Sequence, residues 1–160
     1  MAKTEKIAVG GMIQTKDLVL IRVLGAARGP AVAGKTLSKL GRRGINIVCV
    51  VSFVDASGRE NIAFTISKDD LDQALGLLQT IKEEIQAETI EYQRNCCVIS
   101  VYGPHFSERP AIAGNMFAAT AEEGIDIHLI STSISTISCV IDEAQMQKAV
   151  AKLQQTFLVP

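Results

Sequence analysis

The apolar positions of this chain follow two spacings that alternate along its length. Residues 18–24, 45–53 and 96–102 are short, nearly continuous apolar runs rich in branched side chains, which predicts buried strands. Between such runs, apolar residues recur three and four positions apart, as on one face of a helix; the first such stripe is Val32, Ala33, Leu37 and Leu40. The alternation predicts a fold that mixes helices and strands.

A hairpin and a second helix follow the first helix. Residues 55–58, Asp-Ala-Ser-Gly, have the composition of a tight turn, and Ile62, Phe64 and Ile66 beyond it alternate as one face of a strand. Residues 71–81 then carry an amphipathic helical stripe, and residues 88–92 read as a short edge strand. This half of the chain is therefore expected to have the order β-α-β-β-α-β.

The same order occurs twice. Pro30, Gly34 and Gly44 have counterparts 80 residues later (110 − 30) at Pro110, Gly114 and Gly124. After the hairpin the offset falls to 75 (Met146 against Leu71), which predicts a shorter hairpin in the second copy. In both copies we expect the proline to open a helix, and the second glycine to end it with a left-handed backbone.

The two copies predict two ferredoxin-like units. The second copy lacks a strand after its last helix, and the spare apolar segment at residues 7–12 can fill that place. The sequence therefore predicts an α+β fold in which the first unit, residues 16–92, is inserted between an N-terminal strand and the rest of the second. The second unit is then residues 1–15 and 93–160.

Composition excludes several classes of function. A net charge of −1 leaves no basic surface for nucleic acid, and 4% aromatic residues leave few surfaces on which bases could stack. The apolar runs are too short to cross a bilayer, and the N-terminus lacks a signal-peptide pattern, so we expect a cytoplasmic protein. The cysteines fall inside apolar runs without metal-ligand spacing, which predicts buried thiols and neither metal nor cofactor.

Residues 29–36 raise an alternative, because they spell Gly-x-x-x-x-Gly-Lys-Thr, the phosphate-binding P-loop pattern. The second copy has Asn115 and Met116 in place of the Lys and Thr, and a helix that begins near Pro30 would close the loop. The other interpretation is that Gly34 and Gly114 let a helix approach a neighbouring backbone closely. Nucleotide binding at residues 29–36 stays open as an alternative.

The loops at residues 25–30 and 103–110 each end at a predicted helix N-terminus, where unpaired N–H groups favour a carboxylate. Asn46 and Asp126, at the starts of predicted strands, offer oxygens to an ammonium group. Both residue types also satisfy their own backbone in turns, so a purely structural role is an equal expectation for them.

One motif gives a family resemblance. Residues 124–133, Gly-Ile-Asp-Ile-His-Leu-Ile-Ser-Thr-Ser, resemble the Gly-Ile-Asn-Ile-x-x-Ile-Ser-Thr-Ser strand of the tandem ACT domains in the regulatory region of aspartokinases. The resemblance covers nearly the whole chain. It implies a non-catalytic regulatory protein that forms homodimers, binds threonine or lysine between ACT units of two chains, and controls a kinase catalytic domain or subunit.

The resemblance also implies effector-binding positions. On this chain they fall at Arg28, Gly29, Pro30, Ala31, Val32, Ala33, Asn46, Ser52, Ile125, Asp126 and Ile127.

Several residues depart from the family pattern. Arg28 stands where an Asp is usual, Ser52 and Phe53 replace Gln-Asn, Ala111 replaces a Gly, and Ile134 replaces a Glu. An arginine would favour the negative end of a ligand, so the effector can differ from threonine or lysine. A second alternative follows, namely an interaction scaffold whose ligand sites have decayed.

Overall fold

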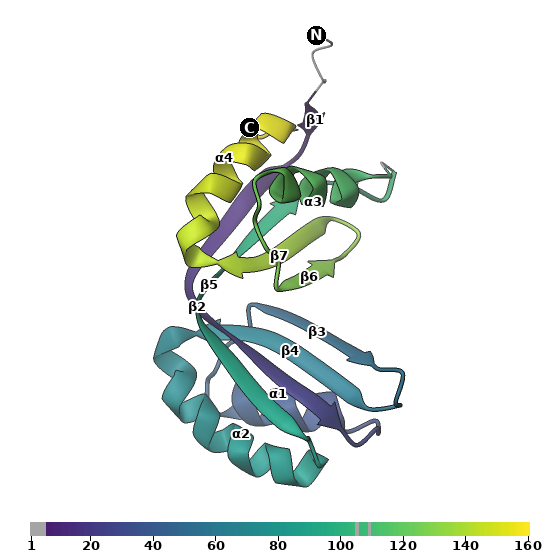
Figure 1. Cartoon of the computed structure of the whole chain (residues 1–160), viewed down its shortest axis with the longest axis vertical. Helices are drawn as coiled ribbons and strands as arrows, with labels where there is room; N and C mark the ends of the chain where they lie inside the picture. The colour runs from purple at the N-terminus through teal and green to yellow at the C-terminus, as the bar shows by residue number, and fades with distance from the viewer. Residues whose placement is uncertain (1–5, 105, 109) are drawn as a thin grey trace. The chain divides into compact units, whose positions relative to one another are not determined.

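The computed structural model describes residues 6–104, 106–108 and 110–160, and it divides the chain into two compact units (Figure 1). The inserted unit is Asp17–Cys96. The split unit consists of the chain up to Lys16 together with Cys97–Pro160. Residues 1–5, which the sequence assigns to the second unit, lie outside the described residues.

The inserted unit has the predicted ferredoxin-like order. Its sheet has the strand order β3-β4-β2-β5, in which β2 and β5 also contribute residues to the split unit. Helices α1 and α2 lie on one face of this sheet (Figure 1). The strands and helices have these bounds: β2 Gly11–Ala26, α1 Val32–Arg42, β3 Cys49–Val54, β4 Glu60–Ser67, α2 Leu71–Ile85 and β5 Thr89–Tyr102.

Period-two alternation builds the core of the inserted unit. Ile21 of β2 lies opposite Phe64 of β4, and Val19 lies opposite Ile66, so these side chains share the face that the helices cover. All four are at most 1% exposed. The helical stripe around Leu78 of α2 completes this core, as the apolar spacing predicts.

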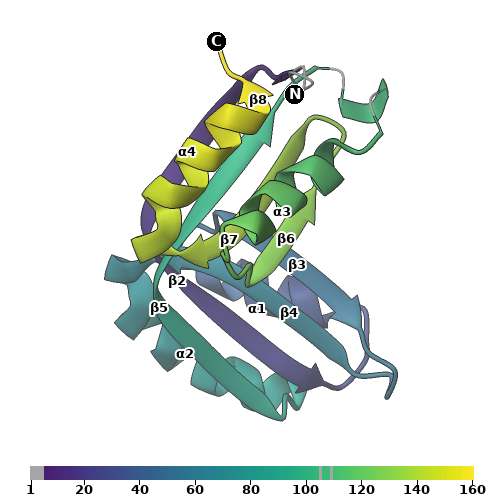
Figure 2. The ribbon, with the colours of Figure 1, turned by 45° about the horizontal axis from the view of Figure 1, so that its top comes forward.

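The split unit repeats the arrangement with the strand order β2-β5-β7-β6. Helices α3 and α4 lie side by side over its sheet (Figure 2). Helix α3 begins 80 residues after α1 (112 − 32) and α4 begins 75 residues after α2 (146 − 71), which confirms both offsets of the repeat. The bounds are α3 Ile112–Glu122, β6 Leu129–Thr132, β7 Thr136–Asp142 and α4 Met146–Thr156.

Short elements complete both units. Strand β1 (Ile7–Ala8) pairs in parallel with β8 (Phe157–Leu158), so a two-residue strand does follow the last helix. Single 3₁₀ turns precede α2, α3 and α4, at Lys68–Asp70, Phe106–Glu108 and Glu143–Gln145.

Two long strands extend across segments that were expected to be separate. Strand β2 runs from Gly11 to Ala26, so it contains all of the expected segment 18–24 but only the last two residues of 7–12, and β5 joins 89–92 to 96–102. Apart from Ile13, the linking residues 13–17 and 93–95 are polar and show no strand pattern, yet they lie within the two strands. Asp17 and Asn95 interrupt the regular backbone with left-handed φ values of 57° and 58°, which these residue types tolerate.

Other boundaries also differ from the expectation. The helices begin at Val32 and Ile112, two residues after Pro30 and Pro110, and strands β3 and β6 begin four residues later than residues 45 and 125. Strand β3 begins later than expected because the N–H of Ile45 donates to the carbonyl of Leu40. The backbone at Ile45 therefore closes helix α1 instead of pairing with a strand.

The glycine assignments had mixed outcomes. Gly44 and Gly124 have φ values of +77° and +66°, which confirms the left-handed helix ends. The close-packing interpretation of Gly34 and Gly114 is wrong within this chain, because a Cβ added at either residue would meet nothing within 4 Å.

Two further expectations concern the burial of the cysteines and the absence of membrane-spanning segments. Cys49, Cys96, Cys97 and Cys139 are buried, as predicted. In the part of the chain that the structure describes, no helix is long and apolar enough to span a membrane.

Candidate functional site

The start of α1 presents an uncapped helix end beside the loop that follows β2. The N-cap residue is Ala31, whose side chain cannot accept a hydrogen bond, and the first turn contains no acidic residue. The N–H of Lys35 donates to the carbonyl of Ala31 at 2.7 Å, which is the first bond of the helix ladder. The partial positive charge of this helix end is therefore not neutralised by its own side chains.

A cavity of about 180 Å³ opens at this helix end. Three segments surround it: the loop after β2, the first turn of α1 and the last turn of α2. The residues that line it are Ala27, Gly29, Ala31, Val32, Lys35, Glu84, Ile85 and Gln86.

The cavity carries one charge of each sign. Lys35 lies on α1, and Glu84 lies near the end of α2. The Lys39 ammonium donates to the Glu84 carboxylate and, with a smaller contribution from Lys35, holds the pKa of Glu84 below its ordinary value against some desolvation. Glu84 is therefore ionised at neutral pH. A cation, an anion and a helix N-terminus together complement a zwitterion.

The β3–β4 hairpin holds two walls of this cavity in place. The Arg59 guanidinium donates from Nε to the carbonyl of Gly25 at 2.9 Å, and from a terminal nitrogen to the carbonyl of Gln86 at 3.3 Å. Asn61 accepts from the N–H of Gly25 at 3.0 Å through its Oδ1. The end of β2, just before the loop that lines the cavity, and the end of α2 are thus tied to one hairpin.

Asp55 supports that hairpin from within. Its carboxylate accepts from Nδ2 of Asn61 at 3.1 Å and from the N–H groups of Ser57 and Arg59. These bonds, that from Asn61 first, hold the pKa of Asp55 below its ordinary value. The turn of residues 55–58 is as predicted, since the N–H of Gly58 donates to the carbonyl of Asp55 at 2.9 Å.

The split unit has a cavity of about 240 Å³ at the start of α3. Ala111, the N-cap of α3, has a left-handed φ of 76°, and the end of β6 faces the helix start through Thr132 and Ser133. Thr132 is the repeat counterpart of Ser52 (132 − 80). Of the described residues that line this cavity, none is charged; they are Phe106, Pro110, Ala111, Ile112, Ala113, Thr132, Ser133 and Ile137.

The structure brings only some of the expected effector residues together. Gly29, Ala31 and Val32 line the cavity at α1, and Pro30 and Ala33 are their neighbours in sequence. Arg28 is exposed and does not line the cavity, where the cation is Lys35.

The remaining expected residues lie elsewhere. Asn46 and Asp126 are exposed in the connections before β3 and β6, and Ser52 is exposed on β3. Ile125 is 5% exposed, and it and the half-buried Ile127 pack in the core of the split unit.

No local sequence pattern indicated several of the residues that line the cavities. Glu84 and Gln86 are more than 50 residues from the loop at Gly29, and no local pattern connects them with it. Lys35 was identified only as the lysine of the P-loop pattern and not as an effector contact. Thr132 and Ser133 belong to the family motif of residues 124–133, but they were not among the expected contacts.

The structure gives no support to nucleotide binding at residues 29–36. Gly34, Lys35 and Thr36 lie inside the first turns of α1, so the open loop that would wrap phosphates is absent there. Thr36 is fully buried, and its hydroxyl donates to the carbonyl of Val32 at 2.8 Å. A buried hydroxyl bonded within the helix does not reach a metal ion.

Comparison with known proteins agrees with the fold. The family model described as ACT domain matches residues 99–157. The chain is 27% identical over 153 residues to aspartokinase 2 of Bacillus subtilis (strain 168), covering 96% of this chain and 37% of that protein. This chain therefore spans little more than a third of that relative's length.

Two solved structures match this chain over nearly their whole length. The ligand-free regulatory subunit of aspartate kinase from Thermus thermophilus aligns with a TM-score of 0.83 and 29% identity, covering 94% of this chain and 99% of that one. A chain from the structure of aspartokinase alpha and beta subunits aligns with a TM-score of 0.83 and 30% identity, covering 93% and 98%.

Proposed function

The chain belongs to the aspartokinase family, in which it corresponds to the regulatory region of tandem ACT units, and from this membership we propose that it binds a free amino acid as an effector. It corresponds to the regulatory part of its relatives and not to their catalytic domain. The proposed role is to control the activity of an aspartokinase catalytic subunit or domain in amino-acid biosynthesis.

The observation that carries the proposal is the cavity at α1. The uncapped helix end and Lys35 favour the carboxylate of an amino acid, and Glu84 favours its ammonium. Gly29 adds no side chain to the cavity wall, so a ligand can approach the backbone. At about 180 Å³, the space suits one small amino acid.

The chain is also proposed to associate with a second copy of itself. Strand β3 lies at the edge of its sheet and exposes apolar side chains, namely Val50 at 38%, Phe53 at 56% and Val54 at 46%. An edge strand with exposed apolar residues is a template for pairing with another strand. We infer a homodimer formed through β3.

A thermal-shift panel tests the proposal. One amino acid of the twenty should raise the melting temperature of the chain, because a ligand that binds only the folded state stabilises it. At a concentration one hundred times Kd, the gain is about 2.7 kcal/mol, which is roughly 5–10 °C for a chain of this size. Melting temperatures that no amino acid raises would favour a scaffold with decayed ligand sites.

A further inference from the structure

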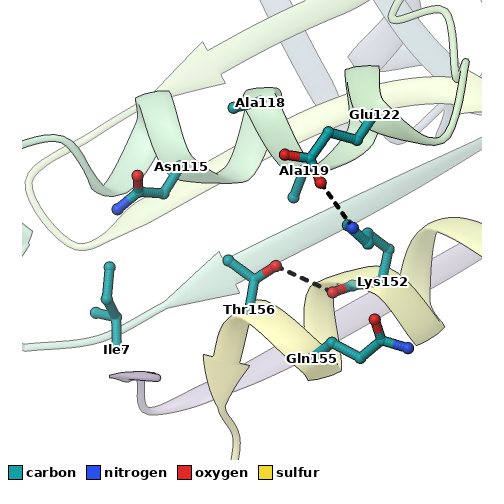
Figure 3. Close-up of a pocket in the computed structure, with 8 residues that line it drawn as sticks. All are labelled: Ile7, Asn115, Ala118, Ala119, Glu122, Lys152, Gln155 and Thr156. Carbon is teal, nitrogen blue, oxygen red and sulfur yellow. Dashed lines mark hydrogen bonds and ion pairs between the residues drawn. The ribbon is translucent and has the colours of Figure 1, made fainter. Parts of the chain in front are cut away.

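The groove between α3 and α4 contains a hollow of about 350 Å³, larger than either cavity at a helix start. It forms because Ala118 and Ala119 are small and leave space where α4 passes α3, and Ile7 closes one end (Figure 3). This volume falls at the lower end of the range for small-molecule sites, which is roughly 300–1,000 Å³.

Polar side chains line this hollow from both helices. Asn115 and Glu122 extend from α3, and Lys152, Gln155 and Thr156 extend from α4 (Figure 3). The Thr156 hydroxyl already donates to the carbonyl of Lys152 at 3.1 Å. The side-chain amides of Asn115 and Gln155 make no hydrogen bond within the part of the chain that the structure describes. Two amide groups are therefore available to a ligand.

An ion pair crosses the groove. The Lys152 ammonium lies 2.7 Å from the Glu122 carboxylate and 3.8 Å from that of Glu123. The hydrogen bond with Glu122 is the main cause that raises the pKa of Lys152, against some desolvation. The Lys152 side chain is 21% exposed and that of Glu122 is 67% exposed, so the anion can turn toward solvent while the cation stays in place.

From this geometry we propose that the α3–α4 groove is a second small-molecule site, which binds a zwitterionic α-amino acid. The ligand carboxylate replaces Glu122 beside Lys152 and accepts from the Asn115 or Gln155 amide. The ligand ammonium pairs with the displaced Glu122 carboxylate, and the ligand's apolar atoms lie on Ala118 and Ala119.

Charge complementarity between the ligand and the Glu122–Lys152 pair favours a zwitterion. A zwitterion that opens the Glu122–Lys152 pair gives each partner a new counter-ion, so neither is left uncompensated. A simple anion lacks the contact with Glu122, and a simple amine lacks the contact with Lys152, so each makes one charged contact fewer than a zwitterion. Amines and N-acetylated amino acids should therefore bind more weakly than the parent amino acid.

The inserted unit does not carry this set of groups. The repeat counterparts of Asn115, Glu122 and Lys152 are Lys35, Arg42 and Leu77 (115 − 80, 122 − 80 and 152 − 75). The charges across the α1–α2 groove therefore differ from those across α3–α4. The proposed site belongs to the split unit alone, and it does not require the cavity at α1 to bind.

Nuclear magnetic resonance of the ¹⁵N-labelled 160-residue chain tests the proposal. Each of the twenty amino acids is titrated, and we expect at least one to give saturable shifts of the backbone amides of Asn115, Ala118, Ala119 and Gln155. The decarboxylated amine and the N-acetyl derivative of that amino acid should bind at least about tenfold more weakly, because each loses one charged contact.

Variants assign those shifts to the groove. Lys152→Met and Glu122→Gln should each weaken binding about tenfold or more. Lys82→Met, the same change on α2 of the inserted unit at a residue that does not line the hollow, should leave the affinity within about twofold of wild type. Circular dichroism checks that each variant is folded.

Two results would overturn the proposal: no amino acid shifts these amides, or Lys152→Met and Glu122→Gln both bind as tightly as wild type. The same spectra separate this outcome from failure of the proposed effector site, since ligand at the α1 cavity shifts Gly29, Ala31 and Val32 instead. Either site can fail while the other binds.

Discussion

At Gly25 the backbone has a left-handed φ of 65°, and an added Cβ would lie 2.7 Å from the side-chain carboxyl carbon of Glu88. The left-handed backbone opposes any residue with a Cβ, whereas the flexible Glu88 side chain, 66% exposed, can move aside. Gly25→Ala should therefore lower the free energy of unfolding by about 1–3 kcal/mol. Urea denaturation followed by circular dichroism measures this change.

A glycine in a helix provides the matched control. Gly76 lies inside α2 and an added Cβ there meets nothing within 4 Å, so Gly76→Ala should raise stability by about 0.5–1 kcal/mol. If Gly25→Ala unfolds at the same urea concentration as wild type, the strain assigned to Gly25 is wrong.

Single residues also show how far sequence alone can predict this molecule. Burial of Ile62, Phe64 and Ile66 was predictable, because alternation along one strand is a local property of the sequence. The lining of the α1 cavity was not, because Glu84 and Lys35 meet only after α1 and α2 pack on the same sheet. Arg28 was the expected cation, but its exposed side chain lies outside that lining.

The β3–β4 hairpin is the element that holds the cavity at α1. Asn61 is 6% exposed, and its Oδ1 accepts from the N–H of Gly25. Asn61→Ala leaves this buried N–H without an acceptor, so we expect a loss of about 1–3 kcal/mol in the free energy of unfolding. Urea denaturation measures the loss, and effector binding should weaken with it.

Ser57→Ala is the control in the same hairpin. Its exposed side chain is removed while its N–H can still donate to Asp55, so stability should change by less than about 0.5 kcal/mol. Equal stabilities of Asn61→Ala and Ser57→Ala would show that Asn61 does not hold the loop.

The hairpin also predicts an acid dependence. The hydrogen bonds to Asp55, that from Asn61 first, lower the pKa of Asp55 in the folded state below its unfolded value of about 3.9. Stabilisation from Asp55 is therefore complete above that unfolded value and is lost as the pH falls through the lower folded pKa. Asp55→Asn should lose less stability than wild type between about pH 5 and about pH 2.

Urea denaturation of both proteins across this range of pH measures the difference. Parallel decline of wild type and Asp55→Asn would mean that the Asp55 hydrogen bonds do not depend on its charge.

Element order was predictable, whereas element length was less so. The repeat gave the order of both units, and α1 and α3 start at the predicted offset. The mostly polar middle segments of β2 and β5 show no alternating strand pattern. These segments are held by pairing with a neighbouring strand and not by burial of apolar side chains. Long-range strand pairing leaves little trace in a single sequence.

For the whole molecule, self-association should depend on the edge strand β3. Val50 and Val54 lie on the same face of β3, since they are four residues apart in a strand, and both are exposed. Replacing both by Lys places charge on this edge, which opposes strand pairing. We expect Val50→Lys/Val54→Lys to shift the chain from dimer to monomer in sedimentation velocity.

Ile134→Lys is the matched control for the charge introduced. Ile134 is 76% exposed, more than either valine, and it lies in the split unit outside β3. If Val50→Lys/Val54→Lys remains a dimer and Ile134→Lys becomes a monomer, the dimer interface does not include β3.

The proposed regulatory role depends on an amino-acid effector that binds at the start of α1, beside Lys35. The most direct measurement is the melting temperature of wild type, Lys35→Met and Lys82→Met against each of the twenty amino acids; Lys82 lies on α2 outside the cavity lining. We expect one amino acid to raise the melting temperature of wild type and Lys82→Met, and to raise that of Lys35→Met much less. No rise for wild type with any amino acid, or an equal rise for all three proteins, would contradict this expectation.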